Sequence, residues 1–343
     1  MKSCLLAVLA AGASALAPLH PAQPVSRPAL ARTPTPTMLG LPWAKAAAPA
    51  TATVAVTGLA STLAGPLALP ACTAIATVPC ALAMIRQAYV FSLSYGLAAA
   101  AIGGAVLRAA GAGAAPLLKL HAQLVLAYGL RLFAFLFWRQ EVAAKEEWTR
   151  KLSALDKTPR AERVPLIVST AFFYALMTSP LLFHYQAGAL APTLMAKAGA
   201  AVAAAGLAIE AVADQMKSFD KMRLKAQGAA PRLYTGGLYA ISRHANYLGE
   251  IVFWVGSFMM GAPALLVGAG AGWGAAAIAL GRVAASGLGL AGIVFIMLSA
   301  TKRLEGRQAE SAPSVWPVLM ADGELDSYEK YVARTSKLVP FLG

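Results

Sequence analysis

Residues 241–260 read ISRHANYLGEIVFWVGSFMM, and this stretch joins a polar cluster to the start of a long apolar run. The run continues to about residue 268, which is long enough to cross the hydrocarbon core of a bilayer as a helix. Similar runs recur along the chain, which is 58% hydrophobic and only 13% charged. A soluble domain carries about 25% charged residues. The sequence therefore predicts an all-α, polytopic helical membrane protein.

The apolar runs predict six or seven transmembrane helices. They lie near 65–85, 87–107, 117–138, 164–187, 190–212, 246–268 and 276–300. The first run contains Pro66, Pro70 and Pro79, and proline disfavours a continuous helix. The number of transmembrane helices is therefore seven if this run spans the membrane and six if it does not. We expect residues 51–343 to form one multi-span membrane domain.

Three charged segments separate these runs, at 139–163, 213–245 and 301–343. Two expected spans lie between the first and the second segment, and two more lie between the second and the third. All three segments therefore belong on one side of the membrane. They are rich in Lys and Arg, which places that side in the cytosol, or in the stroma of a plastid.

The first 50 residues have the pattern of a targeting sequence. Residues 1–15 combine a Lys, a short apolar core and an Ala-Ser-Ala ending, as in a signal peptide. Residues 16–50 are rich in Pro, Ser, Thr and Ala and lack acidic residues, as in a transit peptide. The combination predicts the plastid membrane of an alga with a secondary plastid. The alternative is an ordinary secretory signal before a disordered linker, with the protein in an endomembrane such as the endoplasmic reticulum.

The distribution of charge and the positions of the histidines argue against nucleic-acid binding and against a metal site. The net charge is +14, but the basic residues lie between apolar runs and are not interleaved with aromatic residues, so we do not expect nucleic-acid binding. The four histidines are His20, His121, His184 and His244, and no two of them have metal-ligand spacing. The sequence predicts no metal site and no disulfide framework. It does not indicate an oligomeric state.

The opening stretch carries polar side chains at helical spacing. If it starts a helix, one face bears Arg243, Asn246, Tyr247 and Glu250, with His244 at its edge. A second polar face lies upstream on 210–221, and its members are Glu210, Asp214, Lys217 and Lys221. Ionisable groups near hydrocarbon are costly and indicate a polar site or a ligand.

Four ordered stretches resemble one family. RHANYLGE at 243–250 resembles the Arg-His-Pro-Asn-Tyr-x-Gly-Glu motif of proteins with the steroid 5-alpha-reductase C-terminal domain, with Ala245 in place of Pro. ADQMKSF at 213–219, YGLRLFAFLFWRQE at 128–141 and YEKYVARTSKLVPFLG at 328–343 resemble other stretches of that family. The resemblance covers residues 128–343, which would form the reductase-like core.

The resemblance implies a membrane oxidoreductase that uses NADPH to reduce a conjugated, enone-type lipid. Such an enzyme delivers hydride to one end of the conjugated system and a proton to the other. Carried over position by position, the NADPH site would include Asp214, Arg243, His244, Asn246, Tyr247 and Glu250. Arginine suits phosphate, and carboxylate or amide groups suit ribose hydroxyls and the carboxamide.

The proton donor and the substrate are left open. Steroid reductases use an acidic residue in their N-terminal spans, but this chain has no acidic residue before Glu141. The remaining candidates for the proton donor are Tyr247 within the motif, and Tyr89, Tyr95 or Tyr128 outside it. The lipid could be a steroid, an isoprenoid or a fatty-acyl compound.

Two other functions are compatible with the sequence. Isoprenylcysteine carboxyl methyltransferases have a similar helical core and a similar Arg-His-Pro-x-Tyr element, but they bind S-adenosylmethionine. The NYLGE ending and the Asp214-Gln215 pair favour the reductase. A non-catalytic membrane or lipid-binding protein is the second alternative.

Overall fold

The computed structural model describes residues 67–143, 145–188, 190, 193–229, 232–315, 318–319, 325–326 and 328–339. The expected signal peptide at 1–15 and the transit-like segment at 16–50 lie outside these residues. The plastid or endomembrane location therefore stays a prediction.

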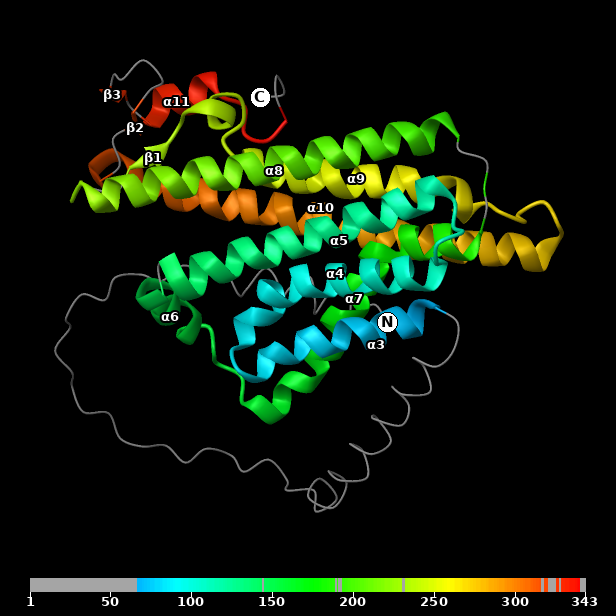
Figure 1. Cartoon of the computed structure of the whole chain (residues 1–343). Helices are drawn as coiled ribbons and strands as arrows, with labels where there is room; N and C mark the ends of the chain where they lie inside the picture. The colour runs from blue at the N-terminus through cyan, green and yellow to red at the C-terminus, as the bar shows by residue number, and fades with distance from the viewer. Residues whose placement is uncertain are drawn as a thin grey trace.

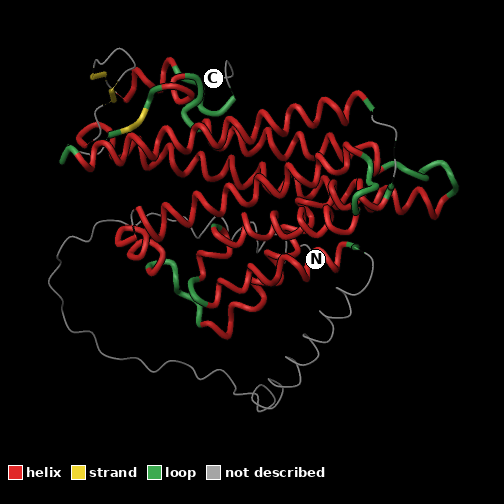
Figure 2. The backbone as a smooth tube through the Cα atoms, viewed as in Figure 1, coloured by secondary structure: helices red, strands yellow, loops and turns green. Residues whose placement is uncertain are grey.

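The described chain is built almost wholly of helices (Figures 1 and 2). The α-helices are α3 (Leu69–Cys80), α4 (Leu93–Ala110), α5 (Pro116–Phe137), α6 (Lys145–Ser153), α7 (Val164–Gln186), α8 (Leu194–Ala226), α9 (Ala245–Leu265), α10 (Trp273–Val315) and α11 (Tyr328–Arg334). Short 3-10 helices are η2 (Ala81–Met84), η3 (Gln87–Phe91), η5 (Arg160–Arg163) and η6 (Gly237–Ala240), and a π-helix, η4 (Trp138–Ala143), extends α5.

Six of these helical segments are long and apolar enough to cross a membrane. They are Leu93–Ala110, Pro116–Ala143, Arg160–Gln186, Leu194–Ala226, Ala245–Leu265 and Trp273–Glu310. The prediction of an all-α polytopic membrane protein is confirmed. The first apolar run gives a shorter helix over Leu69–Met84, which contains Pro79 and turns into a 3-10 helix at Ala81.

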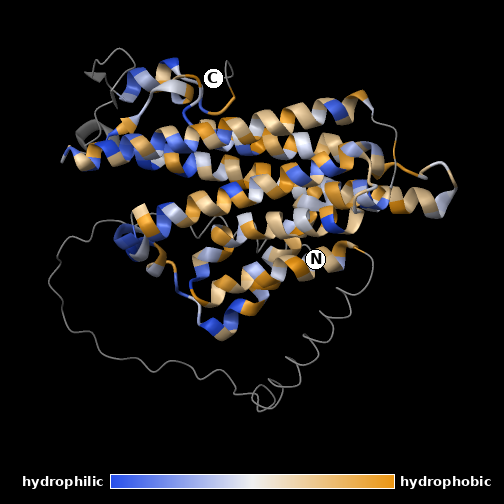
Figure 3. Cartoon of the chain, viewed as in Figure 1, coloured by the Kyte–Doolittle hydropathy of each residue, from blue (hydrophilic) through white to orange (hydrophobic). Residues whose placement is uncertain are grey.

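The charged ends of the helices converge, as their sidedness predicts. Strand β1 (Leu233–Tyr234) pairs with β2 (Val318–Leu319) in parallel, and β2 pairs with β3 (Leu325–Asp326) in antiparallel fashion. Hydrophilic residues gather at the end of the bundle that carries α6, β1 and α11 (Figures 1 and 3). Glu147 of α6 and Lys221 of α8 lie within electrostatic reach of each other. All three charged segments therefore meet at one end of the bundle.

Helix α9 packs against α7, α8 and α10. Its contact with α8 is made by small residues on both helices, including Gly206 of α8 and Gly249 and Gly256 of α9. A Cβ atom on Gly206 would lie 2.7 Å from the carbonyl oxygen of Gly249. Small residues let helix backbones approach closely in lipid, where no hydrophobic force drives helices together. This contact sets α8 and its carboxylates against the motif helix α9.

We expect Gly206→Ala to destabilise the protein by about 1–3 kcal/mol, because the added methyl group meets backbone atoms that cannot move aside. Gly287→Ala in α10 is the matched control, since a Cβ there has no atom within 4 Å. The control should be neutral or stabilising, because alanine has the higher helix propensity. The thermal midpoint in detergent measures both. Equal midpoints for the two variants would contradict the close α8–α9 contact.

Candidate functional site

The polar motif lies across the start of α9. The helix begins at Ala245, and His244 is its N-cap residue, with φ −129° and ψ 50°. Ala245 takes the first helical position, where proline is often found because its missing N–H is not needed there. The expectation that Arg243 lies on the helical face is therefore wrong, because Arg243 precedes the helix. Asn246, Tyr247 and Glu250 do lie on α9.

Arg243 connects the motif to the C-terminal segment. Its Nε and Nη2 donate to the two carboxylate oxygens of Glu305 in α10, at 3.2 and 2.8 Å. Its Nη1 donates to the carbonyl oxygens of Val332, at 3.0 Å, and Thr335. All three guanidinium nitrogens are thus engaged with the protein, and the side chain is only 8% exposed. The structure gives Arg243 a positioning role, and its contact with a cofactor phosphate stays a prediction.

His244 shares the same carboxylate. Its Nε2 lies 2.7 Å from Glu305 Oε1, and its ring stacks on Tyr247 with centroids 5.7 Å apart. Burial lowers the pKa of His244, and the hydrogen bond to Glu305 raises it only in part. The imidazole is therefore neutral near pH 7, with Nε2–H as the donor to the carboxylate. This arrangement fixes the Tyr247 ring beside the motif.

A buried ion-pair cluster joins α5 to α8. Arg131 Nη1 donates to Glu210 Oε1 at 2.7 Å, and Arg131 Nη2 donates to Asp214 Oδ2 at 2.6 Å. Glu210 and Asp214 are both buried, as their shared helical face predicts. Arg131 was not among the expected site residues. An arginine within the apolar run after Tyr128 was the signal that could have identified it.

Glu250 lies against a cluster of aromatic side chains from α4, α5 and α9. Tyr95 Oη donates to Glu250 Oε1 at 2.8 Å and lies 3.0 Å from Tyr128 Oη. Trp254 Nε1 donates to Tyr95 Oη at 2.6 Å. All four side chains are buried. A carboxylate from α9 thus meets a pair of tyrosines, Tyr95 and Tyr128, from the N-terminal half of the described chain.

Tyr89, the other tyrosine considered as a proton donor, lies away from this cluster. Its hydroxyl group donates to Glu141 Oε1 in η4. Burial, followed by the hydrogen bond to Glu141, raises the pKa of Tyr89 to about 12. This pair joins η3 to the end of α5, so the structure gives Tyr89 a connecting role.

Several cations gather around Tyr247. Arg139, Arg303 and Arg307 all lie within electrostatic reach of its phenol group. Lys217 lies on the same side of the bundle, with Nζ 5.4 Å from the centre of the Tyr239 ring. We call Arg139, Lys217, Arg303 and Arg307 the basic cluster.

The basic cluster has unused hydrogen-bonding capacity. Arg139 Nε is buried without a hydrogen-bond partner among the described residues, and so are Arg303 Nε and Nη2. Buried donors are normally paired, and an unpaired one costs about 1–3 kcal/mol. Arg139 lies in η4, and π-helical turns inside α-helices often mark functional sites. The cluster is thus suited to an anion with several acceptor oxygens.

Polar groups of the motif border the basic cluster. Asn246 Oδ1 lies 3.5 Å from Tyr239 Oη, and Asn246 and Tyr247 are half-buried. Asp214 lies within electrostatic reach of Arg139 and Lys217. Burial, followed by the charge of Asp214, raises the pKa of Tyr239. The expected residues Asp214, Asn246 and Tyr247 therefore lie together with the basic cluster.

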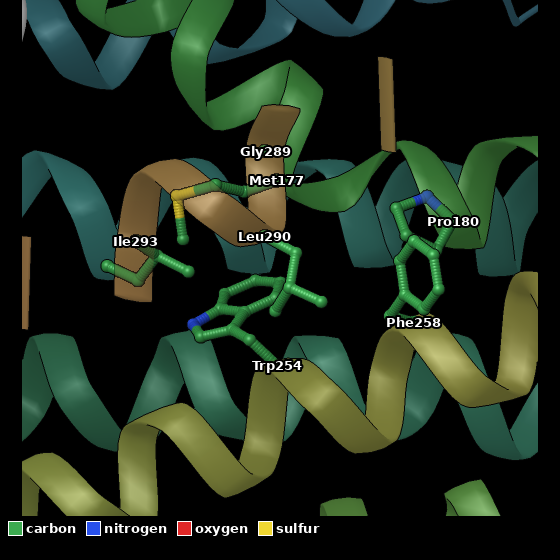
Figure 4. A pocket seen from close by; sticks show the side chains of 7 residues that line it. All are labelled: Met177, Pro180, Trp254, Phe258, Gly289, Leu290 and Ile293. Atoms are coloured by element: carbon green, nitrogen blue, oxygen red, sulfur yellow. The ribbon is translucent and has the colours of Figure 1, made fainter. Parts of the chain in front are cut away.

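Two narrow apolar crevices flank the Trp254 indole, deeper in the bundle than Glu250. One lies between α7, α9 and α10, and Figure 4 shows its lining residues Met177, Pro180, Trp254, Phe258, Gly289, Leu290 and Ile293. The other is lined by Tyr95, Ala99, Tyr174, Met177, Thr178 and Trp254. Neither has room for a water molecule. The second crevice touches the Tyr95 side chain, and the two share Met177 and Trp254.

The site is therefore layered along α9. Asn246 and Tyr247 lie at the level of the basic cluster, Glu250 lies about one helical turn deeper, and Trp254 lies one turn deeper again. Each layer has its own chemistry: cations at the charged end, a hydrogen-bonded carboxylate in the middle, and apolar crevices below.

Comparison with known proteins identifies one family. A family model described as "Protein of unknown function (DUF1295)" matches residues 91–298, which is more than half of the chain. No curated protein and no solved structure matches the chain. The matched range begins before α4 and ends within α10, so it contains Tyr95, Arg131, Asp214 and the whole motif.

Proposed function

The chain belongs to the DUF1295 family, which includes steroid 5-alpha-reductase-like membrane proteins, and we propose that it is a membrane reductase that uses NADPH to reduce a conjugated lipid. One observation carries the proposal. The basic cluster, in which Arg139 and Arg303 have unpaired guanidinium nitrogens, lies one helical turn from a carboxylate that accepts a hydrogen bond from a tyrosine hydroxyl group. An anionic cofactor and a proton donor can thus meet the same substrate.

The residues of the basic cluster fit the charge of NADPH. Its diphosphate and 2′-phosphate offer many acceptor oxygens, and arginine binds such groups through paired N–H donors. Arg139 and Arg303 have the unused donors for this contact, whereas Arg243 is engaged with Glu305. In the proposal, Asp214 and Asn246 contact ribose hydroxyls or the carboxamide. Bound NADPH would supply the hydride.

The remaining residues of the site handle the proton and the acceptor. Tyr95 and Glu250 hold one proton between oxygens 2.8 Å apart, and Trp254 orients the phenol through its N–H. We assign the proton donor to Tyr95. After the transfer, Glu250 would take up a proton from water and pass it to the Tyr95 phenolate. Tyr247, the donor named from the motif, lies among the cations and is assigned to the cofactor side.

The crevices beside Trp254 favour an apolar acceptor. They lie below Tyr95, so a substrate whose carbonyl oxygen reaches Tyr95 would extend its hydrocarbon part between α7, α9 and α10 (Figure 4). Because the crevices are closed to water, the helices must separate when the lipid enters. Steroid, isoprenoid and fatty-acyl enones all satisfy these requirements.

The methyltransferase alternative is disfavoured by charge. S-adenosylmethionine carries a sulfonium cation, which the basic cluster would repel, because like charges in a poorly solvated site interact strongly. NADPH has the opposite charge. The basic cluster therefore favours NADPH over S-adenosylmethionine. A titration with each of the two cofactors distinguishes the reductase from the methyltransferase.

The test is ligand-dependent thermal stability of the detergent-purified full chain. A ligand that binds only the folded state raises the midpoint, by an amount equivalent to about 2.7 kcal/mol at a hundred times its Kd. We expect NADPH to stabilise the protein and S-adenosylmethionine not to. Stabilisation by S-adenosylmethionine alone would show a methyltransferase. The absence of a shift with either ligand, on folded protein, would favour a non-catalytic protein.

Arg139→Gln should raise the Kd for NADPH by about 10- to 100-fold, because a charge-assisted hydrogen bond contributes about 1.5–3 kcal/mol. The midpoint without ligand should fall only modestly, through loss of the contacts of Arg139 with the Phe135 and Trp148 rings. Arg150→Gln is the matched control, because Arg150 is an exposed arginine on the neighbouring helix α6. Equal NADPH affinities for the two variants would show that Arg139 does not bind the cofactor.

A further inference from the structure

A second polar centre lies within the bundle, away from the basic cluster. His121 of α5 and His184 of α7 approach each other with their Nδ1 atoms 3.2 Å apart. His121 is fully buried, and His184 is 4% exposed. His121 Nε2 lies 2.9 Å from Ser257 Oγ of α9. Ser257 follows Glu250 by two helical turns, about 10 Å along the axis, so this centre is separate from the basic cluster and from the carboxylate of the proposed reductase site.

Two facing Nδ1 atoms at this distance form a hydrogen bond when one imidazole is the Nδ1–H tautomer and the other is the Nε2–H tautomer. A neutral imidazole has one N–H donor and one acceptor nitrogen, so the pair must share a proton or bind a cation through both lone pairs. Ionisable side chains inside a membrane bundle are costly and mark functional sites. Phenylalanine or leucine would fill the same space without that cost. The pair therefore marks a candidate site inside the bundle.

The spacing suits a transition metal. Zinc binds imidazole nitrogen at about 2.0–2.1 Å with tetrahedral geometry, which places two ligand nitrogens about 3.3–3.4 Å apart. The observed separation is 3.2 Å. A zinc ion could thus bind both Nδ1 atoms with little movement of α5 or α7. Magnesium and calcium prefer oxygen ligands and do not suit this pair.

Ser257 completes the arrangement around His121. A metal-binding histidine usually donates its other ring N–H to an oxygen, which fixes the tautomer and orients the ring. Ser257 Oγ is in place to accept from His121 Nε2–H, which leaves the Nδ1 lone pair directed at His184. His184 lies two residues before the end of α7, so a water ligand would have to enter from this end of the helix.

We propose that His121 and His184 form a zinc-class metal site that joins α5 to α7. No group of three or more His, Cys, Asp or Glu side chains suitable for a metal occurs in the described part of the chain. The ion therefore has two protein ligands and completes its shell with water or another small ligand. Because both protein ligands are neutral imidazoles, we expect zinc to bind more weakly here than at a structural site with cysteine thiolates. The histidines are 63 residues apart, which is why sequence spacing predicted no metal site.

The experiment is a Zn²⁺ titration of the chelator-treated full chain in detergent, followed by the thermal midpoint and by bound zinc per chain. We expect saturable stabilisation at one ion per chain and none from Mg²⁺. Co²⁺ should give the visible absorption of a tetrahedral site with nitrogen and oxygen ligands. The absence of zinc-dependent stabilisation, or of that absorption on folded wild-type protein, would overturn the proposal.

Variants locate the ion. His184→Asn, at the end of α7, should weaken Zn²⁺ binding at least tenfold and leave NADPH-dependent stabilisation unchanged. Ser257→Ala should weaken it by about 10- to 100-fold, as the loss of such a supporting hydrogen bond does. His20→Asn, which changes a histidine of the N-terminal segment, is the control and should have no effect. Zinc binding that survives both His184→Asn and His121→Asn would place the ion elsewhere and overturn the proposal.

Discussion

Tyr95→Phe should lower kcat for lipid reduction by about 10²- to 10⁴-fold, the range expected for loss of a general acid. The change removes the hydroxyl group that lies between Glu250 and Trp254. The Kd for NADPH should be unchanged, because the basic cluster lies at a different level of α9. The measurement is single-turnover oxidation of NADPH with the best acceptor from a panel of steroid, isoprenoid and fatty-acyl enones.

Tyr174→Phe is the matched control. Tyr174 is buried and stacks on Tyr95 with ring centroids 5.3 Å apart, but its hydroxyl group donates to the carbonyl oxygen of Val90. The control should keep most of the activity. Glu250→Gln should leave the first turnover largely intact and lower the steady-state rate, because an amide cannot return a proton to the Tyr95 phenolate. If Tyr95→Phe kept activity within about threefold of wild type, general-acid catalysis by Tyr95 would be excluded. The proton would then come from Tyr128 or Tyr247.

Hydropathy and charge were sufficient to predict the membrane architecture. Apolar runs of span length have few alternatives in a bilayer, because every backbone polar group must be satisfied within the segment. The periodicity of a helix was also sufficient to place Glu210 and Asp214 on one face. The first run was ambiguous for a physical reason, because Pro79 lies within its helix.

Partners between distant segments could not be predicted in the same way. Glu250 meets Tyr95 across 155 residues, and Arg243 meets Glu305 across 62. In lipid, apolar surface does not select which helices pack together, so the choice depends on small-residue contacts such as that at Gly206. A single sequence shows the glycine but not the surface that it faces. The motif therefore indicated the site, whereas its contacts required the structure.

Arg243→Met should destabilise the protein by about 3–5 kcal/mol, because removing one partner of a buried ion pair leaves the other charge uncompensated. The side chains of Arg243 and Glu305 are only 8% and 15% exposed. The change also removes the donors to two carbonyl groups of the C-terminal segment. A lower thermal midpoint and faster tryptic cleavage at Lys330 measure the effect. Arg334→Met is the control, because Arg334 is exposed at the end of α11.

The double variant Arg243→Met with Glu305→Gln separates positioning from cofactor binding. It removes both charges and keeps an acceptor for the His244 N–H, so much of the lost stability should return. If Arg243 only positions the C-terminal segment, the Kd for NADPH should return with stability. A Kd that stays at least tenfold higher in the restabilised double variant would mean that Arg243 binds a phosphate directly. The resemblance implied that second role, but the contacts of Arg243 with Glu305, Val332 and Thr335 favour the first.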